Sequence, residues 1–395
     1  MATQAGAGLS ENPDTVQAAA EAARAAMDAG GLARADWALV FATMPHRAHF
    51  AALLGEVQRT TGAGVLSGCS GAGVVAGDQE VEGGPAVAVL AVRSDRITAD
   101  AHLEPAGDDQ GRAGADALGR RAGPGAALMI AFPDPFAIRL DAMLEALETS
   151  TPGLRAVGAA AAGGKPPSGT FQFCGRNVAT ASLAALRLGG DLRHAIGITQ
   201  GCQPLGPPCR VTKAHDNVVL ELDGRPALDV LRGRLPAGLG DSLARLGGHL
   251  FIGLPPDRSQ SALEPGEYLV RPLFAVDPAR GALLLGDEVR DGQPLAIVLR
   301  DAAAARDDLK EMLGRLAGGD DAAAWDFGLY FNCAGRGAAL YGLPGVDSAY
   351  IARQFPRLPI AGVFGNAEIA PLRGRNCLFT YTGILALCGE SRGGG

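Results

Sequence analysis

The sequence predicts an α/β protein with α+β character, built as two lobes of mixed sheets from repeated β-α-β-β units with covering helices. Three observations support this prediction. Short apolar runs such as WALVFA at 37–42 are typical of strands buried on both faces. Alanine-rich stretches between these runs are typical of helices that cover a sheet. The 57 Gly and 25 Pro among 395 residues indicate many tight turns.

The same order of elements recurs three times along the chain. Each copy has an apolar strand, a helix, a second strand that contains a glycine (Gly68, Gly158 or Gly362) and a further apolar strand. A strand–helix–strand link favours parallel pairing, and the short link to the last strand favours an antiparallel neighbour. We expect first strands at 37–42, 127–131 and 327–331, helices at 49–60, 139–148 and 347–354, second strands at 65–70, 155–161 and 359–364, and last strands at 85–92, 181–188 and 377–387.

The remaining segments complete the two lobes. Strands at 268–276, 282–285 and 295–300 have hairpin-like spacing, which argues against a plain doubly wound fold, and further helices are expected at 13–29, 235–246 and 301–316. The expected organisation is an N-terminal helix within 1–36, an N-terminal domain at 37–235, a C-terminal domain at 236–390 and a disordered tail at 391–395.

Composition and charge exclude several classes of protein. A net charge of −7 is unlike the basic footprint of a nucleic-acid binder. The seven cysteines are odd in number and none has CxxC spacing, so we expect free thiols, no disulfide framework and no metal site or cofactor. The N-terminus lacks the features of a secretory signal, and no apolar run is long enough to cross a membrane. We therefore expect a cytoplasmic protein that binds neither nucleic acid nor membranes.

The run NCAGRG at 332–337 is the first candidate ligand site. It directly follows an expected buried strand, and such loops are the usual ligand sites of α/β sheets. Gly335 and Gly337 allow backbone N–H groups to face an anion, and Arg336 can hold a carboxylate through two hydrogen bonds, with Asn332 and Cys333 beside it. The run predicts a carboxylate or phosphate site. The alternative is that Arg336 pairs with a structural acid.

The run GNAEIAP at 365–371 follows the second strand of the same unit. Because that strand is expected to pair with the first, we expect Asn366 and Glu368 to lie near Arg336. A glutamate accepts hydrogen bonds from an ammonium group, and an asparagine can bind either end of an amino acid. Arg336 and Glu368 together therefore suit a zwitterion. The alternative is a salt bridge between these two side chains.

The turn at 68–71 is the corresponding place in the first copy, and Cys69 and Ser70 are weaker ligand candidates there. The local sequence imitates a nucleophile elbow around Ser70 and a dinucleotide fingerprint at 71–76. Both motifs require a helix directly afterwards, and none is expected here. Neither enzyme class is therefore predicted from this turn.

Several ordered motifs resemble the FIST family (F-box and intracellular signal transduction). They are GCSGAGVVAGDQEVE, GITQGCQPLGPPCRVTKAHDNVVLELDGRPALDVL, LLLGDEVRDGQPLAIVLRDA, FNCAGRGAALYG, FPRLPIAGVFGNAEIAPLRGRN and YTGILALCGE. Together they cover most of the chain between Trp37 and Glu390. Ala367 stands where the family pattern leads us to expect glycine. The resemblance implies a stand-alone bacterial protein with N- and C-terminal FIST domains, because only about 36 residues precede the first expected repeat and leave no room for an F-box.

The resemblance implies a sensory or signal-transduction role in which a small ligand, with amino acids the leading suggestion, is bound. We therefore expect a protein that binds an amino acid or related carboxylate and passes the signal to an unknown partner. Two alternatives are an uncharacterised thiol-dependent enzyme that uses Cys333 and a protein–protein adaptor. No histidine lies near Cys333 in the sequence to act as its base.

Overall fold

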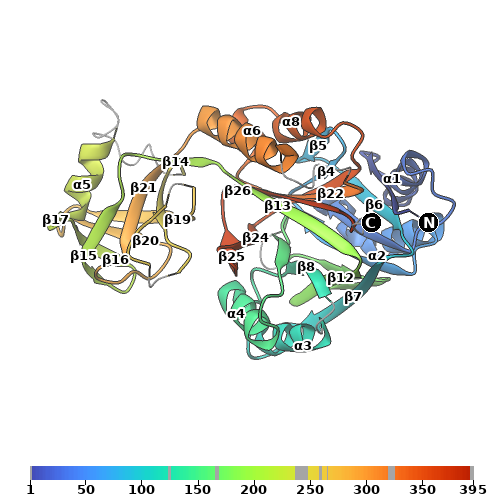
Figure 1. Cartoon of the computed structure of the whole chain (residues 1–395), viewed down its shortest axis with the longest axis horizontal. Coiled ribbons are helices and arrows are strands. Elements are labelled where there is room, and N and C mark those ends of the chain that lie inside the picture. Colours follow the sequence, from blue (N-terminus) through green and yellow to red (C-terminus); the bar gives the residue numbers. More distant parts are fainter. Residues whose placement is uncertain are drawn as a thin grey trace. The chain divides into compact units, whose positions relative to one another are not determined.

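The computed structural model describes residues 2–122, 126–164, 169–235, 248–257, 260–264, 266–318 and 325–391. These residues belong to two compact units (Figure 1). The larger unit comprises Met1–Thr199, Leu309–Leu378 and Thr382–Gly395, and the smaller comprises Gln200–Asp308 and Phe379–Tyr381. Except for Leu235 and Ser391, the helix expected at 235–246 and the tail expected at 391–395 lie outside the described residues.

The described part of the larger unit contains three copies of one arrangement. The first copy consists of β1 (Gln4–Ser10), α1 (Thr15–Ala29), β2 (Trp37–Thr43), the short 3-10 helix η1 (Met44–His49), α2 (Phe50–Thr61), β3 (Val65–Gly71), β4 (Gly73–Ala76), β5 (Gln79–Glu82) and β6 (Val87–Arg93). The second consists of β7 (Ile97–Pro105), α3 (Arg112–Ala122), β8 (Ala126–Pro133), α4 (Leu140–Ser150), β9 (Ala156–Ala160), β10 (Gln172–Cys174), β11 (Asn177–Ala179) and β12 (Ser182–Gly190).

The third copy consists of β13 (Leu192–Gln200), α6 (Ala302–Gly318), β22 (Phe327–Cys333), α7 (Gly337–Tyr341), α8 (Val346–Gln354), β23 (Ile360–Gly365), β24 (Ala367–Leu372), β25 (Arg375–Phe379) and β26 (Thr382–Glu390). In each copy the first core strand pairs in parallel with the second core strand and antiparallel with the last strand. The predicted repetition and pairing directions are therefore confirmed.

In each copy, one hairpin pairs with the sheet of another copy. The hairpin β4–β5 of the first copy joins the sheet of the third, β10–β11 of the second joins the first, and β24–β25 of the third joins the second. Among the described strands, the resulting sheets have the orders β1-β6-β2-β3-β10-β11, β7-β12-β8-β9-β24-β25 and β13-β26-β22-β23-β4-β5. This cyclic exchange relates the three sheets by pseudo-threefold symmetry.

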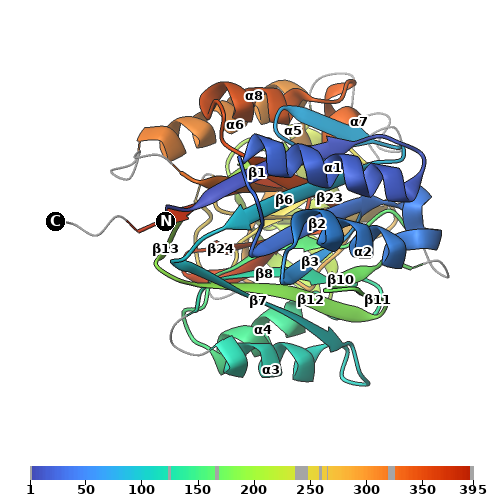
Figure 2. The same ribbon diagram turned by 90° about the vertical axis from the view of Figure 1, so that its right-hand side faces the viewer.

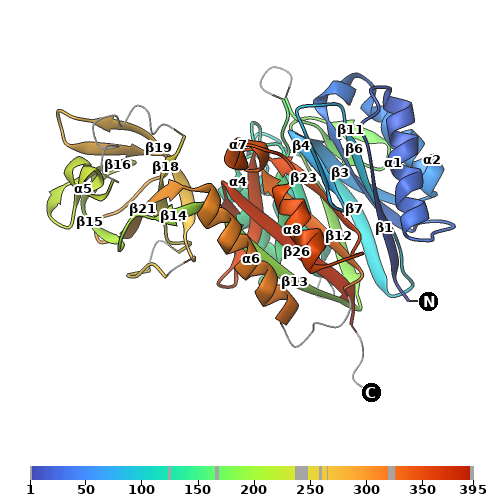
Figure 3. The ribbon, with the colours of Figure 1, turned by 90° about the horizontal axis from the view of Figure 1, so that it is seen from above.

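Helices cover one face of each sheet. The residues of α1 and α2 pack on the first sheet (Figure 2), those of α3 and α4 on the second, and those of α6 and α8 on the third (Figure 3). The opposite faces of the first core strands meet in the centre through the equivalent residues Phe41, Phe132 and Phe331. The ring centroids of Phe41 and Phe132 are 5.5 Å apart, and those of Phe132 and Phe331 are 6.1 Å apart.

The smaller unit is inserted in the third copy between β13 and α6. Its elements are β14 (Cys202–Pro204), β15 (Cys209–His215), β16 (Val218–Leu222), β17 (Arg225–Pro226), α5 (Ala227–Arg234), β18 (Leu250–Leu254), β19 (Leu269–Asp277), β20 (Ala282–Leu285) and β21 (Pro294–Arg300). Pairing of β18 with β21 closes the described strands into a barrel with its own apolar core. The predicted strands at 268–276, 282–285 and 295–300 are confirmed as β19, β20 and β21.

Two local predictions are wrong. The N-terminal segment contains the strand β1 as well as a helix, because QAGAGLS packs its small residues on α1 and pairs with β6. The strand expected at 377–387 is two strands, since the chain turns between β25 and β26 with Tyr381 at a φ of 58°. The compact units also interleave along the sequence, and the domain boundaries at 36 and 235 stay a proposal.

Candidate functional site

The NCAGRG run lies where it was expected, at the carboxyl end of β22 and before α7. Its charged side chain is deeply buried. Arg336 is 1% exposed, and its Nε donates a 2.7 Å hydrogen bond to Asp347 of α8. The two side chains form an ion pair that is closed off from solvent. The structural acid considered as an alternative partner in the sequence analysis is therefore Asp347, and the expected alternative of a salt bridge with Glu368 is wrong.

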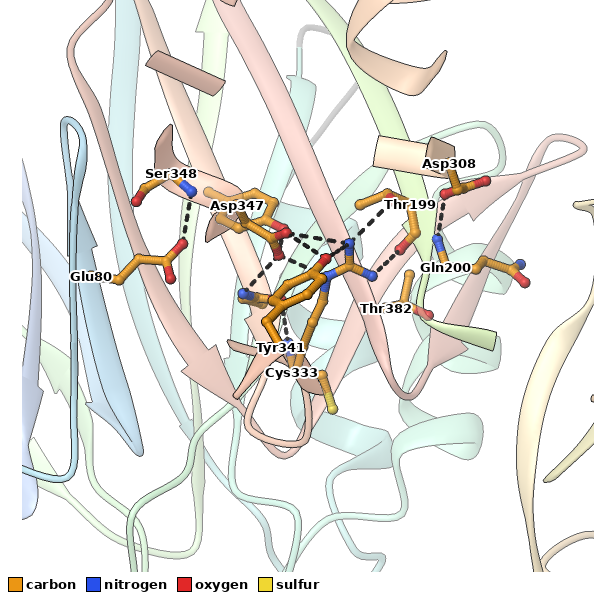
Figure 4. A network of polar contacts seen from close by, with 12 residues as sticks. Glu80, Thr199, Gln200, Asp308, Cys333, Tyr341, Asp347, Ser348 and Thr382 are labelled. Atoms are coloured by element: carbon orange, nitrogen blue, oxygen red, sulfur yellow. Dashed lines mark hydrogen bonds and ion pairs between the residues drawn. The ribbon is translucent and has the colours of Figure 1, made fainter. Parts of the chain in front are cut away.

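Four donors share the Asp347 carboxylate. Tyr330 Oη lies 2.7 Å and Tyr341 Oη 2.8 Å from its oxygens, and Asn332 Nδ2 donates a longer bond of 3.3 Å. Figure 4 shows Tyr341 and Asp347 at the centre of this network. Burial alone would raise the pKa of Asp347, but Arg336 and the hydroxyl donors outweigh it and hold that pKa below its ordinary value. The carboxylate is therefore ionised, and protein hydrogen-bond donors take the place of water around it.

The remaining donors of Arg336 face Thr199, at the end of β13, and Tyr341. Nη2 lies 3.3 Å from Thr199 Oγ1 and 2.9 Å from Tyr341 Oη. Nη1 has a single acceptor among the described residues, the Thr199 carbonyl, at 3.4 Å. Burial would lower the pKa of Arg336, but the charge of Asp347 holds it above its ordinary value. Arg336 thus joins β13, β22 and α8 and keeps limited donor capacity on Nη1.

Two acids from the first copy hold the loop around this network. Glu80 Oε2 accepts a hydrogen bond from Gly345 N and Oε1 one from Ser348 N, each at 2.8 Å, which caps the start of α8 (Figure 4). Glu82 Oε1 accepts from Ala338 N at 2.8 Å. Burial and the charge of Asp347 raise the pKa of Glu80 to about 7. The exchanged hairpin β4–β5 therefore fixes the turn that carries Arg336.

Glu368 occupies a different environment, on the central side of β24. It is fully buried, its Oε2 accepts a 3.4 Å bond from Thr382 N, and its Oε1 has no partner among the described residues. The Cys333 thiol also hydrogen-bonds the Glu368 carboxyl group. Burial raises the pKa of Glu368 well above its ordinary value, although these bonds and Arg336 oppose the shift. Burial therefore favours the protonated, uncharged form of this carboxyl group.

The second copy provides a comparison for Glu368. Gln172 holds the equivalent position, since it pairs with the residue after Gly68 as Glu368 pairs with the residue after Gly158. Gln172 is satisfied at both ends, because its Oε1 accepts from Ser182 Oγ at 3.0 Å and its Nε2 donates to Thr170 Oγ1 at 3.1 Å. The third copy thus carries an ionisable group with a free oxygen where the second carries a satisfied neutral amide.

The other predicted site residues are placed as follows. Asn366 is exposed and donates from Nδ2 to the Ala161 carbonyl at 2.7 Å. Ser70 is buried and donates to the Ala162 carbonyl at 2.9 Å, whereas Cys69 pairs across the strands with Gln172. Gly337 begins α7 with a φ of 48°, and Gly335 precedes Arg336 in the same turn. The structure brings Asn332 to Asp347 and Cys333 to Glu368, but Cys69 and Ser70 contact neither pair.

Sequence reasoning missed Glu80, Tyr330, Tyr341 and Thr199. Tyr341 and Asp347 follow Arg336 by 5 and 11 residues, so their closeness in the sequence is a usable signal. Glu80 and Thr199 are far away in sequence and reach the turn only because the hairpin β4–β5 and strand β13 join the third sheet. Pairing between strands of different copies cannot be recognised from a local sequence motif.

The surroundings of Cys333 bear on catalysis by a thiol. Cys333 is 5% exposed, and burial favours the protonated form of its neighbour Glu368, which in that form cannot accept a proton. His46 contacts Thr15, His194 contacts Arg155 and His215 contacts Asp216.

Within the described residues, no group of three or more His, Cys, Asp or Glu is arranged to hold a metal ion. No described helix is long and apolar enough to span a membrane.

Comparisons with known proteins agree with the resemblance to the FIST family. The family model for the FIST N domain matches residues 36–225, and that for the FIST C domain matches residues 227–371. An uncharacterised protein of Mycobacterium tuberculosis is 35% identical over 388 residues, which span 97% of this chain and 98% of the relative. An uncharacterised protein of Mycobacterium bovis is 32% identical over 388 residues, which again span 97% of this chain and 98% of the relative. The chain belongs to the FIST family, whose domains are signal-transduction domains thought to bind small ligands.

Proposed function

We propose that this protein is a sensor that reversibly binds an amino acid or related carboxylate at the carboxyl ends of β22 and β23. The main support is Glu368, a buried carboxyl group with one oxygen left without a partner among the described residues. Such a group costs roughly 1–3 kcal/mol of stability when nothing offsets it. Buried groups left in this state are frequently functional.

The ammonium group of the ligand would bind Glu368. Approach of a cation lowers the pKa of a carboxyl group, so Glu368 would release its proton and form an ion pair. The Thr382 N–H and the Cys333 thiol already contact the carboxyl group and would support its ionised form. A ligand that lacks the ammonium group would bind without this proton release.

The carboxylate of the ligand would bind Arg336 through Nη1, which has one long hydrogen bond among the described residues. The Asp347 charge balances that of Arg336, so the main contribution of the pair is to hold the turn in place. Asn332 and Asn366 would supply further polar contacts, and Cys69 and Ser70 would contribute less. Because Arg336 and Glu368 are at most 1% exposed, ligand entry requires the covering residues to move. That movement would couple binding to a change of shape that a partner can read.

The test is isothermal titration of the protein with individual amino acids and with the matching acids that lack the amino group. Titrations in two buffers of different ionisation enthalpy report proton release. We expect saturable binding of at least one amino acid with release of about one proton, because Glu368 ionises. Glu368→Gln, which keeps the shape of the side chain, should weaken binding about ten-fold or more and abolish the proton release.

Glu311→Gln is the matched control, since Glu311 is exposed on α6 and pairs with Arg315. It should bind as the unaltered protein does. Thermal shifts provide a parallel measurement, because ligand at about 100 times its dissociation constant adds about 2.7 kcal/mol of stability. Unchanged affinity in Glu368→Gln would overturn the assignment of the site. Absence of binding by every compound would overturn the proposed ligand class.

A further inference from the structure

A pocket lies at the other end of the same two strands, before β22 and β23 begin. It has a volume of about 320 Å³ and is lined by Ala317, Trp325, Gln354, Phe355, Pro356, Arg357 and Leu358. This volume is at the lower end of the range found for small-molecule sites, roughly 300–1,000 Å³. Because β22 has seven residues, roughly 20 Å separate the pocket from the candidate site at the carboxyl end.

The wall of the pocket is mainly apolar and contains two aromatic side chains. Trp325 and Phe355 offer flat surfaces, and Leu358 and Pro356 add aliphatic contact. The Arg193 guanidinium lies 4.2 Å from the Trp325 ring centroid and holds the indole by a cation–π contact. A ring that enters the pocket would therefore meet a positioned indole, not a free side chain.

Polar groups of the pocket remain available for a ligand. Trp325 Nε1 is buried and has no hydrogen-bond partner among the described residues. In the part of the chain that the structure describes, no ion pair or side-chain hydrogen bond is found for Arg357 or Gln354. The pocket thus presents the exposed guanidinium of Arg357 and the exposed amide of Gln354 beside an apolar wall, and the indole N–H lies buried behind that wall.

The third copy differs from the first at this place. Trp325 precedes Phe327 by two residues, as Ala35 precedes Trp37, and Phe327 and Trp37 occupy equivalent positions. Ala35 is fully buried and its N–H donates to the Thr61 carbonyl. A large aromatic side chain with a free donor therefore stands where the first copy has a small packed residue.

We infer that this pocket is a second ligand site and binds a small aromatic carboxylate. The ring lies against Trp325 and Phe355, and the carboxylate pairs with Arg357. A carboxylate matches the positive charge at the rim, and a planar ring matches the aromatic wall. The inference does not depend on amino-acid binding at Glu368.

Nuclear magnetic resonance of the indole N–H groups gives a site-specific test. The chain has two tryptophans, so a ¹⁵N–¹H spectrum of the full-length protein contains two indole signals. Trp37→Phe assigns them and keeps an aromatic ring against Phe327. On titration with benzoate, we expect a saturable shift of the Trp325 signal, because the bound ring lies against its indole, and no shift of the Trp37 signal.

Charge recognition is tested with benzamide and with two arginine variants. Arg357→Gln should weaken benzoate binding about ten-fold, as expected for loss of one charge-assisted pair. Arg353→Gln changes an exposed neighbour on α8 that does not line the pocket and should leave the affinity unchanged. Benzamide should bind about ten-fold more weakly than benzoate. The inference is overturned if the Trp325 signal does not shift saturably, or if Arg357→Gln or benzamide binds as tightly.

Discussion

The Asp347 carboxylate accepts a 2.7 Å hydrogen bond from Arg336 Nε, and both side chains are excluded from solvent. This pair connects the turn after β22 to the helix α8 that covers it. Tyr330 and Tyr341 complete the carboxylate's hydrogen bonds, and Thr199 completes those of the guanidinium. A buried charge that is paired in this way is tolerated, but either partner alone is costly.

Arg336→Ala should lower the free energy of unfolding of the larger unit by about 3–5 kcal/mol, because the ionised Asp347 would be left buried without its counter-ion. The measurement is an unfolding curve in denaturant, monitored by a spectroscopic signal that reports on the larger unit. Replacing both partners, Arg336→Met with Asp347→Leu, should recover most of this loss, because no charge then remains in the interior. If Arg336→Ala unfolds within about 1 kcal/mol of the unaltered protein, the pair does not hold the turn.

The capping of α8 by Glu80 predicts a pH dependence of stability. The folded-state pKa of Glu80 is about 7, above the value of about 4.3 of an unfolded glutamate. The folded state therefore binds more protons than the unfolded state between these two pH values. The contribution of Glu80 to the free energy of unfolding is complete below about pH 4.3 and is lost as the pH rises through about 7.

Unfolding midpoints in denaturant at pH 5 and pH 8 check this prediction. The unaltered protein should lose more stability between these values than Glu80→Gln, which cannot ionise. Glu311→Gln, on an exposed face of α6, should behave as the unaltered protein. Equal losses in the protein and in Glu80→Gln would show that Glu80 does not titrate in this range.

The glycines in the second core strands should resist substitution. A Cβ atom at Gly362 would collide with the Tyr330 carbonyl of the paired strand, as one at Gly158 would with that of Ala131. Gly362→Ala should therefore cost about 1–3 kcal/mol. Gly314→Ala is the control, because a Cβ there meets open space in α6 and should add about 0.5–1 kcal/mol. Equal effects of the two substitutions would contradict a steric role for Gly362.

Much of the fold could be predicted because its repeats are local. Apolar runs and the recurring glycine identified the core strands, and the position of the helix between them indicated parallel pairing. The exchange of hairpins could not be predicted, because β4, β10 and β24 are short and pair with strands of another copy. The strand β1 was missed because its small, mixed residues lack the alternation of a half-buried strand.

The site was predicted in part for the same reason. The NCAGRG turn and the GNAEIAP run are local and lie at the expected strand ends. The partner of Arg336 could not be chosen from sequence, since Glu368 and Asp347 both follow at helix or strand boundaries. Both acids are fully buried, and the hydrogen bond from Arg336 Nε to Asp347 decides between them. Asp347 lies on the helix side of the sheet with Tyr330, whereas Glu368 lies on the central side with Cys333.

The inserted barrel should be dispensable for folding of the larger unit. In the other two copies the edge strand leads to its helix without an insertion, from β1 to α1 and from β7 to α3. The insertion begins and ends at residues in contact, because Gln200 N donates to Asp308 Oδ2 at 2.7 Å. Gly201 and Asp301, just before α6, are also in contact, because Asp301 N donates to the Gly201 carbonyl at 3.2 Å. Replacing 202–300 with a short glycine-containing turn should therefore leave a chain that unfolds cooperatively.

Circular dichroism and denaturant unfolding of the shortened chain would check this expectation. A sound test includes Arg336→Ala in the shortened chain, because the pair with Asp347 belongs wholly to the larger unit. The substitution should lower stability by about the same 3–5 kcal/mol as in the full chain, since distant sites act additively. A shortened chain without a cooperative transition would show that the barrel is required for the larger unit to fold.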